Sequence, residues 1–294
     1  MCTNAGPTVR SMRLGIVAHS ASQTNIRLAS AAPAGVHAFV VAPDDAWREL
    51  ARGDVALGRL DVKPTLDGME DGGRQLELLA RRGVRVLNDS RALRLAHDKL
   101  LCAVALGTAG LPHPLTVSVR SGIERPPLPF PFVLKPRFGS WGRDVLLCED
   151  GAGWTRALDT LSTRPWFARC GAVAQELVPP LGHDLRVLVA RGRVIGAIKR
   201  VAAAGEWRTN VSLGATREPT IPPPAACDLA LSAAATLGGD LVGVDLLPVG
   251  PGRYVAIEVN GAVDFSDAYD LVNDPFESAV DALVGVRRLA AIPA

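Results

Sequence analysis

The sequence predicts an α/β protein in which a small α/β domain is followed by two α+β lobes. Two patterns indicate this class. Short apolar runs alternate with helix-like stretches up to residue 88, as in a parallel α/β sheet. After residue 130, strand-like runs come in sets with one helix between each set, which does not fit a single doubly wound sheet. With 294 residues, 48% of them hydrophobic, the chain can bury a large core.

The first segment supplies the elements of the α/β domain. Residues 12–19 and 36–42 are apolar runs of strand length, with a Ser- and Ala-rich stretch between them. Residues 44–53 and 68–83 are predicted as helices, and 84–88 as a further strand. No GxGxxG fingerprint is present, so a dinucleotide site is unsupported.

The first lobe begins with one long amphipathic helix, predicted over 88–112. Asp89 or Ser90 would cap this helix, and Gly110 with Pro112 would end it. A Pro-rich turn or linker, 124–131, follows. The remaining elements predicted for this lobe are strands at 131–136 and 144–150 around a Gly-containing loop, a helix near 153–162 and a strand at 173–178.

The second lobe is predicted to contain two hairpins. Strands at 184–190 and 194–201 flank the turn Arg191-Gly192-Arg193. The second hairpin joins 241–249 to 254–260. Helices are expected near 224–237 and at 276–290, where the pattern closes the chain.

Composition argues against a nucleic-acid or membrane partner. The 32 basic and 30 acidic residues leave a net charge of +2, which gives no strong electrostatic footprint for nucleic acid; a local basic groove is the alternative. No apolar run reaches the roughly 18 residues needed to span a bilayer, and no signal-length apolar stretch opens the chain. Five scattered Cys without CxxC spacing favour reduced thiols, at positions 2, 102, 148, 170 and 227. We therefore expect a cytoplasmic protein.

The basic residues are 28 Arg and only four Lys, at 63, 99, 135 and 199. A Lys in a chain that otherwise uses Arg suggests a role that needs a compact point charge, such as contact with phosphate. Lys135 ends a predicted strand and precedes a loop with Gly139, Ser140 and Gly142, whose backbone N–H groups can bind phosphate oxygens. The alternative is a surface Lys before an ordinary hairpin loop.

An acidic cluster is the sharpest local signal. Glu258 and Asn260 end a strand and project to one side, and Asp245 in the preceding strand can face Glu258 across the turn. Two carboxylates and an amide oxygen suit Mg²⁺ or Mn²⁺, completed by phosphate oxygens and water. The alternative is a set of solvated residues at a sheet edge.

The order of these features resembles the ATP-grasp ligases, specifically the RimK-like carboxylate–amine ligases. The resemblance covers roughly 84–262 and rests on the blocks LNDSRALRLAHDKL, PFVLKPRFGSWG, VAQE, HDLRVLV, GEWRTN, GVDLL and IEVN. It implies an ATP-grasp fold in three parts, with ATP between the last two. These parts are a pre-ATP-grasp N-terminal domain (1–88), a central lobe (89–173) and a C-terminal lobe (174–294).

The resemblance also implies roles for individual residues. Those implied to contact ATP are Lys99, Lys135, Gly139, Ser140, Gly142, Glu176, Leu177, Val178, Asp184, Lys199 and Asn210. The residues implied to act in catalysis are Arg208 and Lys135. Asp245, Glu258 and Asn260 would hold two Mg²⁺ or Mn²⁺ ions. Glu176 to Val178 would hold adenine, and Asp184 the ribose.

The chain departs from the family pattern at three places. Asp144 stands where the loop often has a Gly, and Lys199 where better-known members often have an acid, so the role of Lys199 stays open. After Asn260 the chain reads GAVDFSDAY (261–269) instead of a small-residue–Pro–Gly turn. This change predicts a reshaped acceptor pocket, in which glutamate is not the best amine donor or the acceptor is unusual.

The implied activity is ATP-dependent amide formation through an acyl phosphate, with release of ADP and phosphate. The carboxylate would belong to a small molecule, a peptide or a carrier protein, and an amine would be the second substrate. The protein would bind neither nucleic acid nor membrane and could form a homo-oligomer. A non-catalytic ATP-binding or regulatory module of the same fold is the alternative, and a pterin- or dinucleotide-binding oxidoreductase is a further one.

Overall fold

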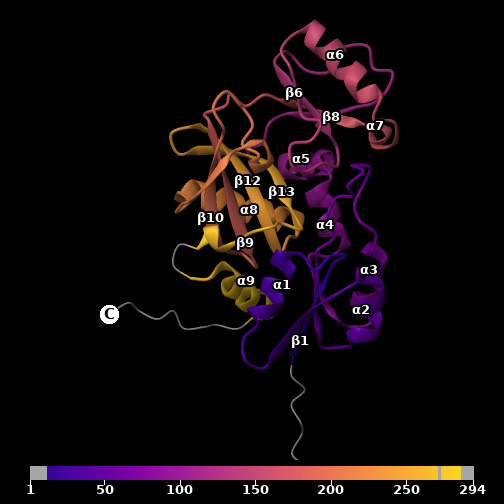
Figure 1. Cartoon of the computed structure of the whole chain (residues 1–294), viewed down its shortest axis with the longest axis vertical. Helices are drawn as coiled ribbons and strands as arrows, with labels where there is room; N and C mark the ends of the chain where they lie inside the picture. Colours follow the sequence, from indigo (N-terminus) through magenta and orange to yellow (C-terminus); the bar gives the residue numbers. More distant parts are fainter. Residues whose placement is uncertain (1–11, 271–272, 286–294) are drawn as a thin grey trace, which may run out of the picture.

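Three β-sheets follow one another along the chain in the computed structural model, which describes residues 12–270 and 273–285. The N-terminal sheet, the central sheet and the C-terminal sheet occupy different parts of the elongated molecule (Figure 1). Each sheet has its own buried apolar cluster, and a fourth cluster joins the N-terminal and C-terminal sheets. The fold therefore leaves room for a site between parts that are distant in sequence.

The N-terminal sheet is parallel, as the alternation of strands and helices predicts, with the order β2-β1-β3-β4. Its strands are β1 (Met12–Val17), β2 (Val36–Val41), β3 (Val55–Gly58) and β4 (Arg85–Leu87). Its helices are α1 (Gln23–Ser30), α2 (Pro43–Glu49) and α3 (Gly73–Arg81). The sequence reading had no element at β3, which is only four residues long, or at α1, which lies in the Ser- and Ala-rich stretch.

The prediction of a single helix over 88–112 is wrong. The structure has two helices, α4 (Ser90–His97) and α5 (Lys99–Thr108), separated by Asp98 in an extended conformation. The Asp98 carboxylate accepts hydrogen bonds from the backbone N–H groups of Leu100 and Leu101, and so caps α5. It also accepts two hydrogen bonds from the Arg137 guanidinium, at 2.7 and 2.6 Å. The break therefore depends on a contact 39 residues away.

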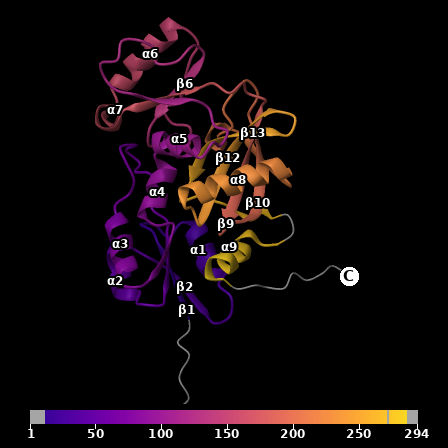
Figure 2. The same ribbon diagram turned by 180° about the vertical axis from the view of Figure 1, so that it is seen from behind.

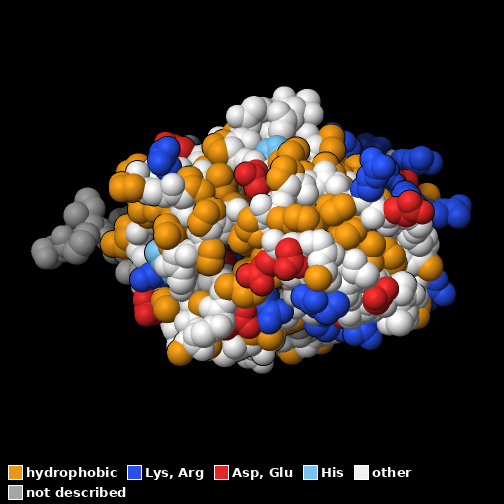
Figure 3. Space-filling view, turned by 90° about the horizontal axis from the view of Figure 1, so that it is seen from above, with side chains coloured by type: hydrophobic (Ala, Val, Ile, Leu, Met, Phe, Trp, Pro, Cys, Tyr) orange, Lys and Arg blue, Asp and Glu red, His pale blue; other side chains and the backbone are white. Residues whose placement is uncertain are grey.

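The central sheet is antiparallel, with the order β5-β8-β6-β7. Its strands are β5 (Thr116–Val119), β6 (Phe132–Pro136), β7 (Leu146–Cys148) and β8 (Ala172–Glu176), and its helices are α6 (Gly151–Ser162) and α7 (Pro165–Cys170). Phe132, Trp154, Leu161 and Trp166 pack in its core. The sequence analysis had no element at β5 or α7. The face of this end of the molecule mixes apolar, acidic and basic side chains (Figure 3).

The C-terminal sheet contains both predicted hairpins. Its order is β11-β10-β9-β12-β13, and all neighbours are antiparallel. Its strands are β9 (His183–Ala190), β10 (Arg193–Val201), β11 (Thr216–Pro219), β12 (Leu241–Gly250) and β13 (Arg253–Asn260). The helices of this part are α8 (Pro224–Leu237), α9 (Pro275–Val284) and the 3₁₀ turns η1 (Val211–Leu213) and η2 (Asp267–Tyr269). The sequence analysis did not predict β11. Of the helix predicted over 276–290, the structure shows α9 up to Val284, and residues 286–290 lie outside the described part.

Helices cover the C-terminal sheet on two sides. Ala230, Ala233 and Leu237 of α8 pack with Val187 and Val244 of the sheet. On the opposite side, α9 lies beside α1 of the N-terminal part (Figures 1 and 2). Apolar side chains from both parts form one cluster there, which includes Leu28, Leu188, Phe265 and Phe276. Burial of this cluster fixes the N-terminal part against the C-terminal sheet.

Two further expectations concern cysteines and membranes. Cys102, Cys148, Cys170 and Cys227 are all free thiols, and Cys2 lies outside the described residues. Within 12–270 and 273–285, the helices are too short or too polar to cross a bilayer.

Candidate functional site

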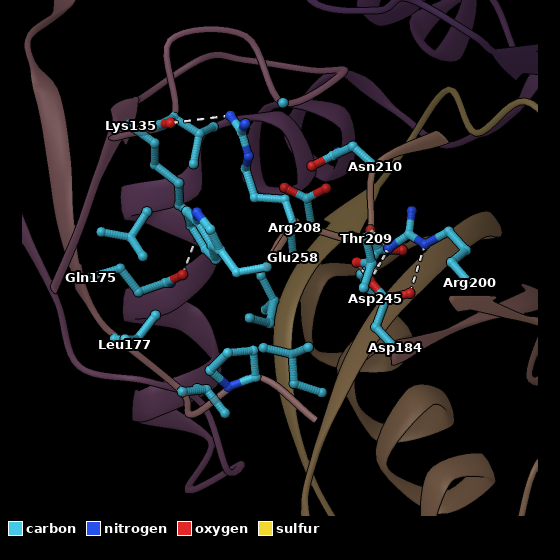
Figure 4. Close-up of a pocket in the computed structure, with 18 of the residues that line it drawn as sticks. Lys135, Gln175, Leu177, Asp184, Arg200, Arg208, Thr209, Asn210, Asp245 and Glu258 are labelled. Atoms are coloured by element: carbon cyan, nitrogen blue, oxygen red, sulfur yellow. Dashed lines mark hydrogen bonds and ion pairs between the residues drawn. The ribbon is translucent and has the colours of Figure 1, made fainter. Parts of the chain in front are cut away.

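A deep cavity lies where the central sheet, the C-terminal sheet and the segment after β10 meet; we call it the nucleotide cavity. Its walls come from the loop after β6, the end of β8, residues 207–210 and the strands β12 and β13. Figure 4 shows the side chains that point into it. The site residues predicted from the sequence that line it are Lys99, Lys135, Gly139, Ser140, Gly142, Glu176, Leu177, Val178, Asp184, Arg208, Asn210, Asp245 and Glu258.

Lys135 is a buried cation with a neutral partner. β6 carries it into the cavity, and its Nζ donates to Gln175 Oε1 on the neighbouring strand β8, at 2.7 Å (Figure 4). Burial lowers the pKa of the Lys135 ammonium to about 8. No carboxylate within hydrogen-bond distance offsets this cost among the described residues. A polyphosphate in the cavity would supply the missing negative charge.

Lys99, the first residue of α5, links the glycine loop to the acidic strand. Its Nζ donates to the Gly139 carbonyl at 2.6 Å and lies 3.1 Å from Glu258 Oε2. Burial by itself would raise the pKa of the Glu258 carboxyl, but the Lys99 and Lys135 ammonium groups hold that pKa well below its usual range. Glu258 is therefore a carboxylate at any physiological pH.

The two predicted acidic ligands face each other across the hairpin. Asp245 on β12 stands directly opposite Glu258 on β13, as strand alternation predicts. Asp245 also accepts two hydrogen bonds from Arg186 on β9, at 2.6 and 2.7 Å, and one from Arg200 on β10, at 2.9 Å. Asp184 completes this network by accepting from Arg200 at 2.7 and 2.5 Å, as Figure 4 shows.

Sheet register explains this charge network. Asp184 pairs with Arg200, and Arg186 with Asp245, as direct neighbours on adjacent strands. The Asp184 and Asp245 carboxylates hold the pKa of the Arg200 guanidinium above its usual value, although burial acts to lower it. Residues 184 and 186 lie on one face of β9, so the ion pairs form one layer on the cavity side of the sheet.

The donor set fits Mg²⁺ or Mn²⁺. Glu258 is ionised, Asp245 is its cross-strand neighbour, and Asn260 follows Glu258 on the same face of β13. In the part of the chain that the structure describes, no three His, Cys, Asp or Glu side chains converge on one point. A metal ion here would therefore need the Asn260 amide oxygen, phosphate oxygens or water to complete its shell.

The glycine loop 137–143 is tied to the segment 208–212. A Cβ at Gly142, where φ is +69°, would lie 2.8 Å from Asn210 Oδ1, so only glycine fits. Ser212 Oγ donates to the Trp141 carbonyl at 2.7 Å. Arg208 contacts the Val145 carbonyl at 3.3 Å and lowers the pKa of Glu206 to about 2 through its hydrogen bonds to that carboxylate.

Asp144, which stands where the family loop is expected to have a Gly, has a left-handed backbone conformation. Its φ is +54°, in the left-handed region that Asp tolerates better than most residues. Its carboxylate accepts from Trp166 Nε1 at 2.9 Å and lies 3.2 Å from Arg164 Nη2. The substitution therefore ties the end of the glycine loop to α7.

The remaining predicted residues are placed as follows. Glu176, Leu177 and Val178 follow β8 along the cavity wall, where the Glu176 N–H donates to the Leu115 carbonyl at 2.9 Å. Asn260 lines an adjoining cavity together with Glu258. Lys199 is not brought to either cavity, because its side chain points to the other face of β10, where its Nζ lies 3.7 Å from Glu218 Oε2.

The sequence analysis gave no site role to three residues that the structure brings to the site. Gln175 holds Lys135, and Arg186 and Arg200 hold Asp245. A signal was available for each: Gln175 directly precedes the segment 176–178 that is predicted to hold adenine, Arg186 is two residues from Asp184, and Arg200 is next to Lys199. Choosing between Lys199 and Arg200 required knowing which face of β10 lines the cavity.

Comparisons with known proteins agree with this geometry. Residues 96–271 match the RimK-like ATP-grasp domain family. A "Probable alpha-L-glutamate ligase" of Haemophilus ducreyi is 32% identical over 218 residues, 72% of this chain and 68% of that protein. A protein of the same name from Parasynechococcus marenigrum is 31% identical over 64% of this chain, and the match spans only 40% of that longer protein.

The fold is shared with solved ligases. The D-alanine–D-alanine ligase of Bacillus anthracis, complexed with ATP, superposes with a TM-score of 0.68 and 17% identity, covering 94% of this chain and 97% of that one. The ATP-grasp fold predicted from the sequence is thus confirmed, as is the predicted class of ATP-dependent carboxylate–amine ligase. The match over 96–271 takes in every predicted site residue, and the chain belongs to the RimK-like ATP-grasp family.

Proposed function

We propose that this protein joins a carboxylate to an amine through an acyl phosphate, with release of ADP and phosphate. One observation carries the proposal. The nucleotide cavity, which holds two Lys and the glycine loop, opens into a second cavity, and the two share Glu258, Arg200, Asn210, Ser140 and Trp141. A nucleotide in one cavity and an organic substrate in the other would meet at these residues.

Within the nucleotide cavity, we assign the adenine to the wall formed by Glu176, Leu177 and Val178 and the triphosphate to the opposite end. Lys99, Lys135 and the N–H groups of Gly139 to Gly142 would bind phosphate oxygens there. Asp184 lines the same cavity, but its carboxylate already accepts from Arg200 and from Thr209 Oγ1, at 2.5 Å. We assign it first to orienting Arg200, and ribose contact remains a prediction.

Asp245, Glu258 and Asn260 would hold divalent ions, with two Mg²⁺ or Mn²⁺ as the proposed number. Such ions, when bound, neutralise charge on the β- and γ-phosphates. The Asp245 carboxylate shares its negative charge with Arg186 and Arg200, so these two guanidinium groups would stay beside the reacting phosphoryl group. No residue is needed as a covalent nucleophile.

The reaction has two balanced steps. A substrate carboxylate oxygen attacks the γ-phosphorus, the bond from that phosphorus to the β,γ-bridging oxygen breaks, and ADP leaves. The amine nitrogen then attacks the acyl carbon, the bond to the phosphate oxygen breaks, and the amine proton is released to solvent as the amide forms. Lys135 and Arg208 would stabilise negative charge on the phosphoryl oxygens, and preorganised cations of this kind act mainly in the transition state.

The carboxylate substrate is proposed to belong to a small molecule, a peptide or a carrier protein. The test supplies ATP, Mg²⁺ and a panel of carboxylates with hydroxylamine as the trapping amine. A hydroxamate formed in equal amount with ADP is the expected result. Formation of AMP and pyrophosphate would replace the acyl phosphate by an adenylate. ATP binding without any turnover across the panel would favour the non-catalytic module.

A further inference from the structure

The second cavity, here called the acceptor cavity, is built by side chains from all three parts of the fold. The residues that it does not share with the nucleotide cavity include Asp61, His97, Arg217, Asn260, Asp264 and Tyr269. Asp61 follows β3, His97 ends α4, and Asp264 lies in the turn 261–269 that departs from the family pattern. The cavity therefore carries features particular to this chain.

Among the residues that the structure describes, one cation of the acceptor cavity is available to a ligand. Three Arg line the cavity, and two of them are engaged: Arg186 with Asp245, and Arg200 with Asp184 and Asp245. Arg217, on the exposed strand β11, makes no ion pair or side-chain hydrogen bond within 12–270 and 273–285. A single carboxylate of a ligand can therefore be paired with Arg217.

Two carboxylates of the acceptor cavity, those of Asp61 and Asp264, are exposed and open to a ligand. The side chains of Asp61 and Asp264 are 48% and 55% exposed. Arg59 Nη2 lies 3.6 Å from Asp264 Oδ1, but the Arg59 side chain is only 2% exposed and cannot reach into the cavity. These acids are suited to a cationic group, and they would repel a second carboxylate.

His97 supplies an acceptor without a partner. Its ring is buried, its Nδ1 lies 3.8 Å from Asp61 Oδ1, and its Nε2 has no hydrogen-bond partner. Burial lowers the pKa of the His97 imidazole and so favours the neutral ring. The approach of Nδ1 to the Asp61 carboxylate favours the tautomer with its proton on Nδ1, which leaves a lone pair on Nε2. A buried acceptor left unpaired is costly and points to a donor that arrives with a ligand.

We propose that the acceptor cavity binds an amino acid with a single carboxylate as the amine substrate. Its carboxylate would lie on Arg217, and its amino group between Asp61, Asp264 and His97 Nε2. This inference rests on the proposed ligase function. It places the amino group near Glu258, which lines both cavities, and it predicts that glutamate binds poorly because its second carboxylate finds no free cation.

Calorimetric titration of the full chain, loaded with Mg²⁺ and a non-hydrolysable ATP analogue, tests the proposal. The probes are glutamine against glutamate and asparagine against aspartate, two pairs that differ by one amide in place of a carboxylate. We expect the neutral member of at least one pair to bind tenfold or more tightly than its acidic partner. Equal or tighter binding of the acidic member in both pairs, or no binding of any probe, would overturn the proposal.

Substitutions in the acceptor cavity test which residues cause the preference for the neutral amino acid. Asp61→Asn combined with Asp264→Asn should reduce the preference for the neutral member to less than threefold, and Arg217→Gln should weaken both members at least tenfold. His97→Leu should weaken binding, and His97→Gln, which keeps an acceptor, should restore part of it. Glu218→Gln, on the same strand as Arg217 but paired with Lys199, is the matched control and should change nothing. An unchanged preference in the double Asp variant contradicts the assignment.

The two proposals can fail separately. An enzyme that forms hydroxamate and ADP but prefers glutamate would overturn only the substrate assignment. A protein with the expected amino-acid preference that never forms ADP would overturn only the ligase mechanism.

Discussion

The ammonium of Lys99 lies 3.1 Å from a carboxylate oxygen of Glu258. This contact joins the first residue of α5 to the end of strand β13. The same ammonium also holds the glycine loop through its hydrogen bond to the Gly139 carbonyl. A phosphate group that enters the site would compete with Glu258 for the Lys99 ammonium. A metal ion would compete with Lys99 for the Glu258 carboxylate. The pair therefore couples the position of the glycine loop to occupancy of the acidic strand.

Removing the buried Lys135 cation should weaken nucleotide binding and lower turnover. Lys135→Met keeps most of the side-chain volume but removes the charge, and we expect turnover to fall roughly 100-fold or more. ATP titration and ligation assays measure the effect, with circular dichroism to confirm folding. Lys199→Met is the matched control, because Lys199 faces away from both cavities, and it should retain wild-type turnover. Full activity in the Lys135 variant would contradict the phosphate assignment.

ATP affinity should depend on pH through the same residue. The pKa of Lys135 in the free protein is lowered to about 8, so the cation is present below that pH and is lost as pH rises through it. Affinity should therefore fall above pH 8, by about tenfold per pH unit at most for one proton. The Lys135→Arg variant keeps its positive charge over this range, so its ATP affinity should depend little on pH between about 7.5 and 9.5. A wild-type affinity that is flat over this range would rule out Lys135 as the titrating contact.

The two acidic residues should differ in their effect on stability. Glu258→Gln and Asp245→Asn should each raise the Mg²⁺ requirement and lower turnover by several orders of magnitude, and Asn260→Ala should be milder. Asp245→Asn also removes the charge that Arg186 and Arg200 share, so it should cost about 3–5 kcal/mol of unfolding free energy. Thermal unfolding beside metal-dependence assays separates the two effects. Small, equal losses in all three variants would indicate a solvated sheet edge.

Asp144 should control the mobility of the glycine loop. Asp144→Gly keeps the left-handed backbone but loses the contacts to Trp166 and Arg164, so we expect faster hydrogen exchange over 137–145 and a higher KM for ATP. Asp144→Ala adds backbone strain of about 1 kcal/mol. Asp159→Ala, on the exposed side of α6, is the control. Unchanged exchange in the Gly variant would show that the side chain does not hold the loop.

The sequence by itself determined the features that depend on local pattern. Apolar runs and turn signals located both hairpins of the C-terminal sheet, and strand alternation placed Asp245 opposite Glu258. The scarcity of Lys directed attention to Lys63, Lys99, Lys135 and Lys199, of which the structure brings Lys99 and Lys135 to the nucleotide cavity. The hairpin and strand-pairing predictions succeeded because strand period and turn chemistry act over a few residues.

The tertiary structure decided what depends on distant partners. Asp98 breaks the long helix because Arg137 binds its carboxylate from the glycine loop, and the choice of Arg200 over Lys199 follows from which face of β10 lines the cavity. Asp61 and Asp264 are 203 positions apart, yet both line the acceptor cavity. They can line one cavity because the apolar cluster between α1, α9 and the C-terminal sheet holds the N-terminal part in place. Burial of apolar surface between distant segments has no sequence-local signature.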